Sequence, residues 1–332
     1  MEDFIEGMPK AELHAHVEGP VEPKPKCQPR HRPPSHAFRA ILIPLVVLLL
    51  YGSVHAEPYK GFPRGHALVT AAEVKAMLDG PAPKPIVLAA VRQVSWLLGH
   101  IPGSLHAPRR AYTGRDGMAM SRERFQEFAR GLGINSDSTV VVYDQTYAAA
   151  RLWWLFRLYG KSDVRVLDGG LTAWKAAGYD VDRGRGHSAP RTGDFVAAPA
   201  VAGWTADMAD VHRGRSDAGT HVWDTRSVKE WDGSVRVRGL PPGRIGWARF
   251  IGWRAFRKVD QGRPSEFRTA AEIDALLRQA GFEPGHDHIF YCHSGVRAAT
   301  PFFALYLMGF PVERLHLYDG SWIEWSRRRS AD

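Results

Sequence analysis

The residues best suited to covalent chemistry form a six-residue loop, Cys292-His-Ser-Gly-Val-Arg297. The apolar run 288–291 before it is typical of a short buried strand, and the sequence after it predicts a helix. In a parallel sheet, such a loop faces the ligand crevice at the carboxyl ends of the strands. Gly295 permits a tight curl that turns backbone N–H groups inward, and these groups together with Arg297 favour a thiolate and attract an anion. We therefore predict that Cys292 is a nucleophile.

The elements that position this loop occur twice in the chain. Each copy begins with the capping-box pattern Thr-Ala-Ala-Glu, at 70–73 and at 269–272, and continues through apolar strands and helices to an Asp-Gly motif, at Asp168 and at Asp319. Short apolar strands that alternate with helices predict a parallel sheet covered by helices on both faces. The fold class is therefore α/β with two tandem domains.

The boundaries of these domains follow from composition and from the repeat. We expect a first domain at 66–185, a Pro-, Ala- and Gly-rich linker at 186–203 and a second domain at 204–330. At the loop of the first copy that corresponds to Cys292, the residue is Asp144. Because a carboxylate repels an anion and cannot replace a thiol as nucleophile, we predict that the first domain is non-catalytic and that the second is catalytic.

The beginning of the chain has the layout of an exported protein. Residues 36–56 place Arg39 before the apolar run 41–50, which is followed by Val54-His-Ala56. The run is shorter than the roughly 20 apolar residues that span a bilayer, so we predict a signal peptide, cleavage after Ala56, a periplasmic or secreted location and no stable membrane association of the mature chain. The alternatives are an uncleaved anchor or a buried helix. Residues 1–35 are expected to be a disordered or misassigned extension.

Cysteine usage supports a functional thiol. The chain has two cysteines, and Cys27 lies upstream of the predicted cleavage, which leaves Cys292 alone in the mature protein. A lone thiol in an oxidising compartment is not consumed by an internal disulfide. The alternative is a small buried hydrophobic residue, which is the common situation of free cysteine.

Composition and charge narrow the class of partner. The chain is 44% hydrophobic and 24% charged, close to an average soluble domain. Its formal charge is +9, and residues 1–56 hold six residues of each sign, so the surplus lies in the two domains. Such a surplus attracts small anions. We expect no nucleic-acid partner, because no basic run interleaved with aromatic residues is present.

The motifs together resemble the tandem rhodanese sulfurtransferases. The resemblance covers residues from about 66 to 328 and rests on the tandem layout, Gly99-His-Ile-Pro-Gly103, the two Asp-Gly motifs and the Cys-x-x-Gly-Val loop. It implies that Cys292 takes sulfur from thiosulfate or 3-mercaptopyruvate as a persulfide and passes it to cyanide or a thiol. It also implies a set of substrate-binding residues without cofactor or metal: His293, Ser294, Gly295, Val296, Arg297 and Arg226.

Departures from the family pattern leave the donor open. Thiosulfate enzymes of the family often have two cations after the cysteine, whereas mercaptopyruvate enzymes tend to have Gly-Ser-Gly-Val. Here His293 is followed by Ser294-Gly-Val296, and the charged loop favours thiosulfate. His293 is either a cationic or neutral ligand or a solvent-facing loop residue. Arg226 either grips the donor or forms an ion pair with a carboxylate such as Asp224.

Three other functions are compatible with parts of the sequence. A rhodanese-like phosphatase or arsenate reductase has its arginine six positions after the cysteine, where this chain has Ala298. A non-enzymatic binding module or sulfur-relay partner would use the surface of the inactive copy. Residues 8–19 separately resemble the opening strand of adenosine deaminases, in which His14 and His16 would be zinc ligands, but no other part of the chain resembles that barrel.

Overall fold

The structure is a computed structural model that describes residues 58–114, 117–145, 147–260 and 263–329. The predicted extension and signal peptide, with His14, His16 and Cys27, lie outside the described residues. Within the part that is described, none of the helices combines the length and the apolar character needed to cross a membrane.

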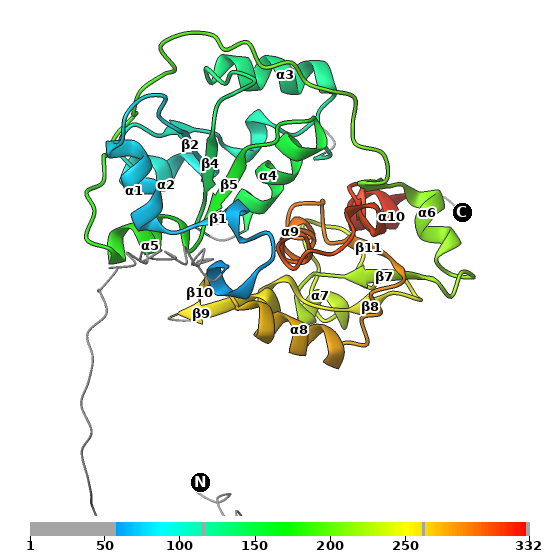
Figure 1. The fold of residues 1–332 in the computed structure, drawn as a ribbon. Helices are drawn as coiled ribbons and strands as arrows, with labels where there is room; N and C mark the ends of the chain where they lie inside the picture. The colour runs from blue at the N-terminus through cyan, green and yellow to red at the C-terminus, as the bar shows by residue number, and fades with distance from the viewer. Residues whose placement is uncertain (1–57, 115–116, 146, 261–262, 330–332) are drawn as a thin grey trace, which may run out of the picture. The chain divides into compact units, whose positions relative to one another are not determined.

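Two five-stranded parallel sheets form the frame of the protein (Figure 1), and both belong to one compact unit of the chain. The first sheet has the order β1-β5-β4-β2-β3 and the second the order β6-β12-β11-β7-β8, which is the same topology repeated. The strands of the first sheet are β1 (Leu68–Val69), β2 (Ile86–Ala89), β3 (Leu105–His106), β4 (Val140–Tyr143) and β5 (Val164–Leu167). Those of the second sheet are β6 (Thr205–Ala206), β7 (Thr220–Asp224), β8 (Arg249–Phe250), β11 (Asp287–Tyr291) and β12 (Leu315–Tyr318). The predicted fold class and tandem arrangement are confirmed.

Helices connect these strands. The helices of the first copy are α1 (Ala71–Asp79), α2 (Gln93–Leu98), α3 (Arg122–Gly131), α4 (Ala148–Leu158) and α5 (Gly170–Ala176), with the 3-10 turns η1 (Tyr59–Gly61), η2 (Gly65–Ala67) and η3 (Arg109–Ala111). The second copy has α6 (Met208–Arg213), α7 (Val228–Trp231), α8 (Ala270–Gln279), α9 (Ala299–Leu307) and α10 (Ser321–Arg329), with η4 (Trp253–Phe256) and η5 (Val312–Arg314). Both predicted capping boxes are present, at the start of α1 and of α8. A two-stranded antiparallel hairpin, β9 (Arg257–Asp260) and β10 (Arg263–Phe267), is an addition that the repeat did not predict.

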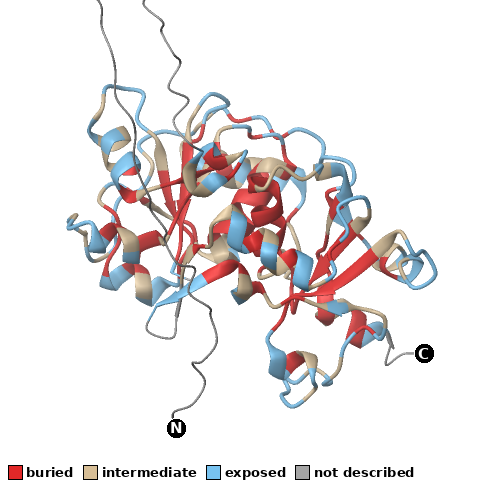
Figure 2. Cartoon of the chain, turned by 60° about the horizontal axis from the view of Figure 1, so that its bottom comes forward, coloured by how far each residue is buried: buried red, intermediate tan, exposed pale blue. Residues whose placement is uncertain are grey.

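The two copies pack through equivalent helices. Figure 2 shows that the strands in the middle of both sheets are largely buried, whereas the edge strands β3 and β8 are not. Helices α4 and α9 contact each other, and the ring of Trp153 lies 4.6 Å from that of Phe303 and 4.7 Å from that of Tyr306. Aromatic contacts of this kind bury large apolar areas, so the two domains share one core.

The aspartate of each Asp-Gly motif accepts a hydrogen bond from the other copy. Asp168 Oδ1 accepts a hydrogen bond from the Phe267 amide of the second domain at 2.7 Å. Asp319 Oδ2 accepts one from the Ala119 amide of the first domain at 2.5 Å. Each motif therefore ties its own sheet to a loop of the partner domain.

The segment 186–203 has neither a helix nor a strand among its residues, and it lies along the first domain (Figure 1). The Phe195 side chain is buried, and its amide donates to the carbonyl of Ile134 at 3.1 Å. The Ala198 amide donates to the carbonyl of Tyr159 at 3.0 Å. Backbone bonds therefore fasten the predicted linker to the first domain.

Candidate active site

Cys292 follows β11, the central strand of the second sheet, and precedes the turn that leads into α9. The residue is only 1% exposed, but it lines a cavity of about 760 Å³. Five of the other predicted site residues line the same cavity: His293, Ser294, Val296, Arg297 and Arg226. The structure therefore brings the predicted residues together around the thiol.

Ser321, the first residue of α10, binds the backbone of the cysteine loop. Its Oγ accepts hydrogen bonds from the amides of Cys292 at 3.2 Å and Gly295 at 3.0 Å, and it donates to the carbonyl of Tyr318 at 2.8 Å. Two of the loop amides are thus used to fix the backbone. Of the described acceptors, none is paired with the amides of Ser294 or Val296, so these N–H groups remain free for a bound anion.

The first turn of α10 donates hydrogen bonds to carbonyl groups of the same loop. The amide of Trp322 donates to the carbonyl of Cys292 and that of Ile323 to the carbonyl of His293, both at 3.1 Å. Because the first amides of a helix have no partner within the helix, they are available for such contacts. The Asp-Gly-Ser-Trp motif therefore supports the cysteine loop directly.

Gly295 is required by its surroundings. Its φ is +73°, in the left-handed region, and a Cβ there would lie 2.2 Å from Asp319 Oδ1. That carboxylate forms an ion pair with Arg151 Nη2 of the first domain at 2.6 Å, and the Arg151 side chain is fully buried. The guanidinium of Arg151 also lies over the ring of Trp154, 4.7 Å from its centroid. A buried ion pair between the domains thus lies directly beneath the loop.

Arg297 is held by a carboxylate of its own domain. Its Nη1 and Nη2 donate to the two oxygens of Glu230, at 2.6 and 2.8 Å. Burial raises the pKa of Glu230, but the hydrogen bonds and the charge of Arg297 outweigh burial and lower that pKa from 4.5 to about 2. Arg297 also interacts electrostatically with Cys292. It contributes a fixed, partly neutralised cation at the cavity wall.

Arg226 is also paired. Its Nε and Nη2 contact the carboxylate of Asp224 at 2.6 to 3.0 Å, and Nη2 donates to the carbonyl of Gly243 at 2.7 Å. The guanidinium lies 4.6 Å from the ring centroid of Trp322. The structure therefore shows the ion pair with Asp224 that was one of the two alternatives for Arg226. The paired Arg226 side chain also lines the cavity.

His293 presents a neutral imidazole to the cavity. Burial, followed by the charge of Arg297, lowers the pKa of His293 from 6.5 to about 4. The side chain is buried, and neither ring nitrogen has a hydrogen-bond partner among the described residues. Burial therefore favours the neutral imidazole, and the solvent-facing alternative is not present in the structure.

Arg109 is the functional residue that the sequence analysis missed. It lies on η3 of the first domain, and its Nη2 donates to Ser294 Oγ at 2.8 Å and contacts the Ser294 carbonyl at 3.5 Å. It lines the cavity and interacts electrostatically with Cys292. Burial lowers the pKa of Arg109, an effect that the charge of Cys292 opposes.

A signal for Arg109 was present in the repeat. The turn at Gly99-His-Ile corresponds to Gly243-Arg-Ile, and the same offset aligns β3 with β8 and η3 with η4. η3 and η4 therefore lie at corresponding places, and η4 residues also line the cavity. Three more cations line the cavity and have no ion-pair partner among the described carboxylates: Lys229, Arg238 and Arg254.

The first domain keeps the frame of the site without its chemistry. The Ile101 amide donates to the Tyr143 hydroxyl just as the Ile245 amide donates to the Tyr291 hydroxyl, at 3.0 and 3.3 Å. Asp144, in the place of the thiol, is buried and accepts from the Ala149 amide at 2.7 Å. Its carboxylate caps the start of α4.

The Asp-Arg pair of the second domain is also missing from the first. The strand registers match Ala89 to Asp224, since these residues pair with Tyr143 and Tyr291 respectively. The residue that corresponds to Arg226 is then Val91. Neither the thiol nor this buried ion pair therefore exists in the first copy.

Comparisons with known proteins agree with this geometry. The model of the rhodanese-like domain matches residues 70–177 and 207–328. The chain is 37% identical over 240 residues to a probable 3-mercaptopyruvate sulfurtransferase of Pseudomonas aeruginosa, covering 68% of this chain and 81% of that one. It is 31% identical over 285 residues to a putative thiosulfate sulfurtransferase of Mycobacterium tuberculosis, covering 79% and 95%.

Solved structures include similar folds. An anaerobic ergothioneine biosynthesis enzyme from Chlorobium limicola, in complex with trimethyl histidine, superimposes with a TM-score of 0.68 at 26% identity, covering 80% of this chain and 69% of that one. The family model matches most of both copies, and the relatives carry the same class of activity in their names. This chain is a two-domain sulfurtransferase that belongs to the rhodanese family.

Proposed function

We propose that the enzyme carries sulfane sulfur on Cys292, from thiosulfate or 3-mercaptopyruvate to cyanide or a thiol. The observation that carries this proposal is the placement of one thiol at the wall of a cavity whose other walls are cationic. Arg109 and Arg297 both act electrostatically on the sulfur. The thiolate is the nucleophilic form of cysteine.

The transfer then has two steps with thiosulfate as the donor. The thiolate of Cys292 attacks the outer sulfur of thiosulfate, a new S–S bond forms, and sulfite leaves with the electron pair of the bond that breaks. The persulfide keeps one negative charge, which the free amides of Ser294 and Val296 are placed to stabilise. Cyanide or a thiolate then attacks the outer sulfur, and the Cys292 thiolate is the leaving group.

We propose thiosulfate as the first donor because four cations of the cavity have no carboxylate partner among the described residues: Arg109, Lys229, Arg238 and Arg254. This surplus suits a dianion better than a monoanion. Two observations favour 3-mercaptopyruvate instead. His293 is neutral, and one of the relatives reported above has that substrate in its name.

Intact-mass measurement tests the proposal. Incubation with thiosulfate should add the mass of one sulfur atom per chain, cyanide should remove it, and the Cys292→Ser variant should show no gain. Parallel incubation with 3-mercaptopyruvate, followed by steady-state comparison of kcat/KM, identifies the preferred donor. Absence of a cyanide-labile sulfur with both donors would contradict the proposal and favour the binding module.

We further propose that residues 36–56 are a signal peptide and that the mature enzyme works outside the cytoplasm. The support is the sequence pattern of Arg39, the apolar run 41–50 and Val54-His-Ala56. Fractionation of the native host, with the N-terminus of the recovered protein read by mass spectrometry, is the test. A mature chain that begins at Glu57 in the extracytoplasmic fraction supports export, and an intact chain in the cytoplasm contradicts it.

A further inference from the structure

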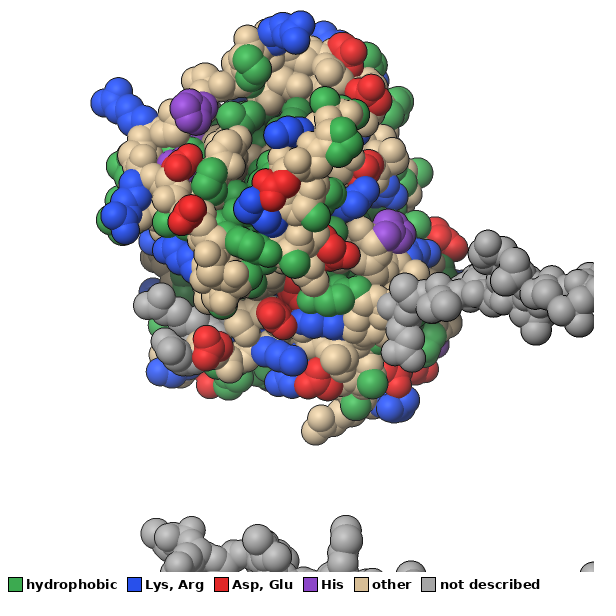
Figure 3. Space-filling model, turned by 60° about the vertical axis from the view of Figure 1, so that its left-hand side comes forward, with side chains coloured by type: hydrophobic (Ala, Val, Ile, Leu, Met, Phe, Trp, Pro, Cys, Tyr) green, Lys and Arg blue, Asp and Glu red, His purple; other side chains and the backbone are tan. Residues whose placement is uncertain are grey.

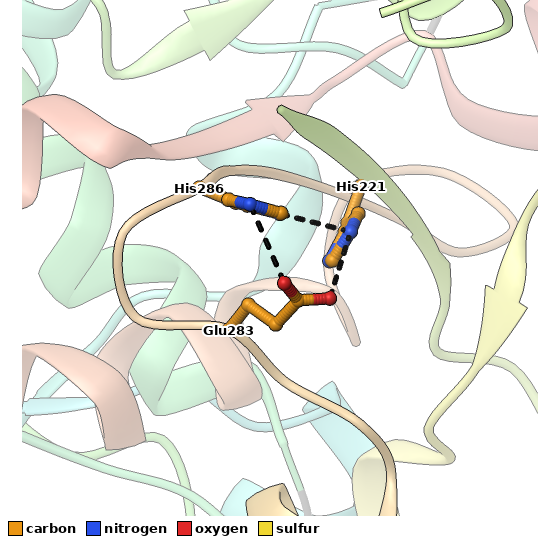
Figure 4. A group of neighbouring side chains, drawn as sticks. All are labelled: His221, Glu283 and His286. Carbon is orange, nitrogen blue, oxygen red and sulfur yellow. Dashed lines mark hydrogen bonds and ion pairs between the residues drawn. The ribbon is translucent and has the colours of Figure 1, made fainter. Parts of the chain in front are cut away.

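Three metal-ligating side chains meet at the end of the second sheet that lies away from Cys292. His221 comes from β7, and Glu283 and His286 come from the loop between α8 and β11. Figure 4 shows both imidazoles directed toward the carboxylate. The ligand atoms of the three residues all lie within 4.8 Å of one another. We propose that His221, Glu283 and His286 form a structural site for a divalent transition metal, with zinc as the best match.

The separations between the ligand atoms suit zinc. His221 Nε2 lies 3.0 Å from His286 Nδ1 and 3.6 Å from Glu283 Oε1, and His286 Nε2 lies 3.4 Å from Glu283 Oε2. Zinc bonds of about 2.0 to 2.2 Å in tetrahedral geometry place ligand atoms roughly 3.3 Å apart. Because His286 uses a different nitrogen toward each neighbour, one ligand atom from each residue gives separations of up to 4.8 Å, and the side chains must rotate to close the site around an ion.

The backbone that carries these ligands is fixed. The amide of His286 donates to the carbonyl of Glu283 at 3.0 Å, and His288 Nε2 contacts that same carbonyl at 2.9 Å. His288 Nδ1 accepts from Trp223 Nε1 at 3.0 Å, so both nitrogens of His288 are engaged. His288 thus acts as a support for the loop, and the ligands are the three residues whose side chains remain available.

One close contact competes with a metal, the 3.0 Å hydrogen bond between His221 Nε2 and His286 Nδ1, and the other contacts of the ligands are weak. The buried imidazole of His221 has no partner at Nδ1 among the described residues, so no bond at Nδ1 opposes rotation of the ring. Arg249 Nη1 lies 3.8 Å from Glu283 Oε1, but it donates its 2.8 Å hydrogen bond to the carbonyl of Gly281. The carboxylate is therefore free to bind a cation. Imidazole and carboxylate ligands suit zinc among the common divalent ions.

The position of the site indicates a structural role. His221 pairs in register with His288, four residues before Cys292, so the cluster lies roughly 13 Å along the strand from the thiol. An ion there would fasten the α8–β11 loop to β7, that is, to the sheet that presents the loop of Cys292. Glu283 and His286 are exposed or half-buried, which leaves room for a fourth ligand from water.

Zinc binding to the full chain in a Cys292→Ser background tests the site, because that background removes the thiol of the second domain as a rival ligand. After equilibrium dialysis against zinc chloride, the metal content should fall by one equivalent per chain when His286→Ala is added. Glu283→Gln should lower the affinity for that zinc ion by more than about tenfold. The control is His187→Ala, an exposed histidine outside the cluster, which should bind as much zinc as its parent.

A stability measurement provides the second readout. Zinc should raise the thermal midpoint of the Cys292→Ser protein, since a ligand of the folded state stabilises it, and it should raise that of Cys292→Ser/His286→Ala less or not at all. Equal zinc content and equal thermal shifts in these two proteins would overturn the proposal, as would the absence of bound zinc in the parent. Neither result depends on sulfur transfer, so the metal site and the enzymatic proposal can fail separately.

Discussion

Arg109 of the first domain donates a hydrogen bond through Nη2 to Ser294 Oγ of the cysteine loop, at 2.8 Å. The half of the chain that lacks the thiol thus supplies a cation to the half that has it. Figure 3 shows one face of the molecule, on which Lys and Arg side chains are interspersed with Asp and Glu. Several Lys and Arg side chains also line the cavity beside Cys292.

Replacement of Cys292 by Ser should abolish sulfur transfer, because a hydroxyl cannot form a persulfide. The fold should be retained, since the change is nearly isosteric. Initial rates of thiocyanate formation from thiosulfate and cyanide measure the first effect, and circular dichroism measures the second. Residual turnover at a tenth of the parental rate would place the sulfur carrier elsewhere.

Arg109→Ala should lower kcat/KM for the anionic donor by about 10- to 100-fold, since a hydrogen bond from a charged donor contributes about 1.5–3 kcal/mol. The neighbouring Arg110 is exposed and does not line the cavity around Cys292, so Arg110→Ala is the matched control and should keep its activity. Steady-state kinetics with thiosulfate decide the matter. Equal kcat/KM for the two variants would show that Arg109 has no part in the site.

Gly295→Ala should lower both stability and activity. The new Cβ would lie 2.2 Å from Asp319 Oδ1, and alanine is disfavoured at φ +73°. We expect a loss of more than about 2 kcal/mol in the free energy of unfolding, measured by urea denaturation. Gly246→Ala, at a position with open space around it, should unfold like the parent. A Gly295→Ala protein of parental stability would contradict the packing described for the loop.

Arg151→Met should destabilise the protein by about 3–5 kcal/mol, because it leaves the Asp319 carboxylate buried without its cation. The contrasting variant is Arg278→Met, which breaks an exposed pair with Asp274 on α8 and should cost no more than about 1 kcal/mol. Chemical denaturation of both variants gives the comparison. Similar costs for the two would mean that the pair between the domains contributes no more than a surface contact.

The Glu230–Arg297 pair should make stability depend on pH in acid. The pKa of Glu230 is lowered from 4.5 to about 2 in the folded protein, so the carboxylate stabilises the fold fully above about pH 4.5. That contribution is lost progressively as the pH falls toward 2. The difference in unfolding free energy between the parent and Glu230→Gln should therefore shrink from about pH 5 to about pH 3. A difference that stays constant over this range would contradict the pairing.

The sequence predicted the elements that depend on local pattern. Both Thr-Ala-Ala-Glu capping boxes were found, because a cap involves residues only three positions apart. The strand before Cys292 and the glycine at the tight curl were found for the same reason. The equivalence of Tyr143 and Tyr291, now visible in their hydrogen bonds, was already present in the repeat.

Long-range partners could not be predicted in this way. Arg109 and Ser294 are 185 positions apart, and they meet because α4 and α9 pack against each other. The use of Ser321 Oγ by two loop amides depends on where the α10 terminus falls relative to β11. The hairpin of β9 and β10 interrupts the second copy alone, so comparison of the copies gave no sign of it.

Asp168 and Asp319 each accept a hydrogen bond from the other domain, so neither domain can be deleted without loss of such a contact. A shortened version that kept only the thiol-bearing half would uncover the aromatic side of α9 and would leave Asp319 with neither its guanidinium nor its amide partner. The first copy, which has Asp144 in place of the thiol, thus supports the structure of the second copy. The two halves of the protein therefore depend on each other for their buried contacts.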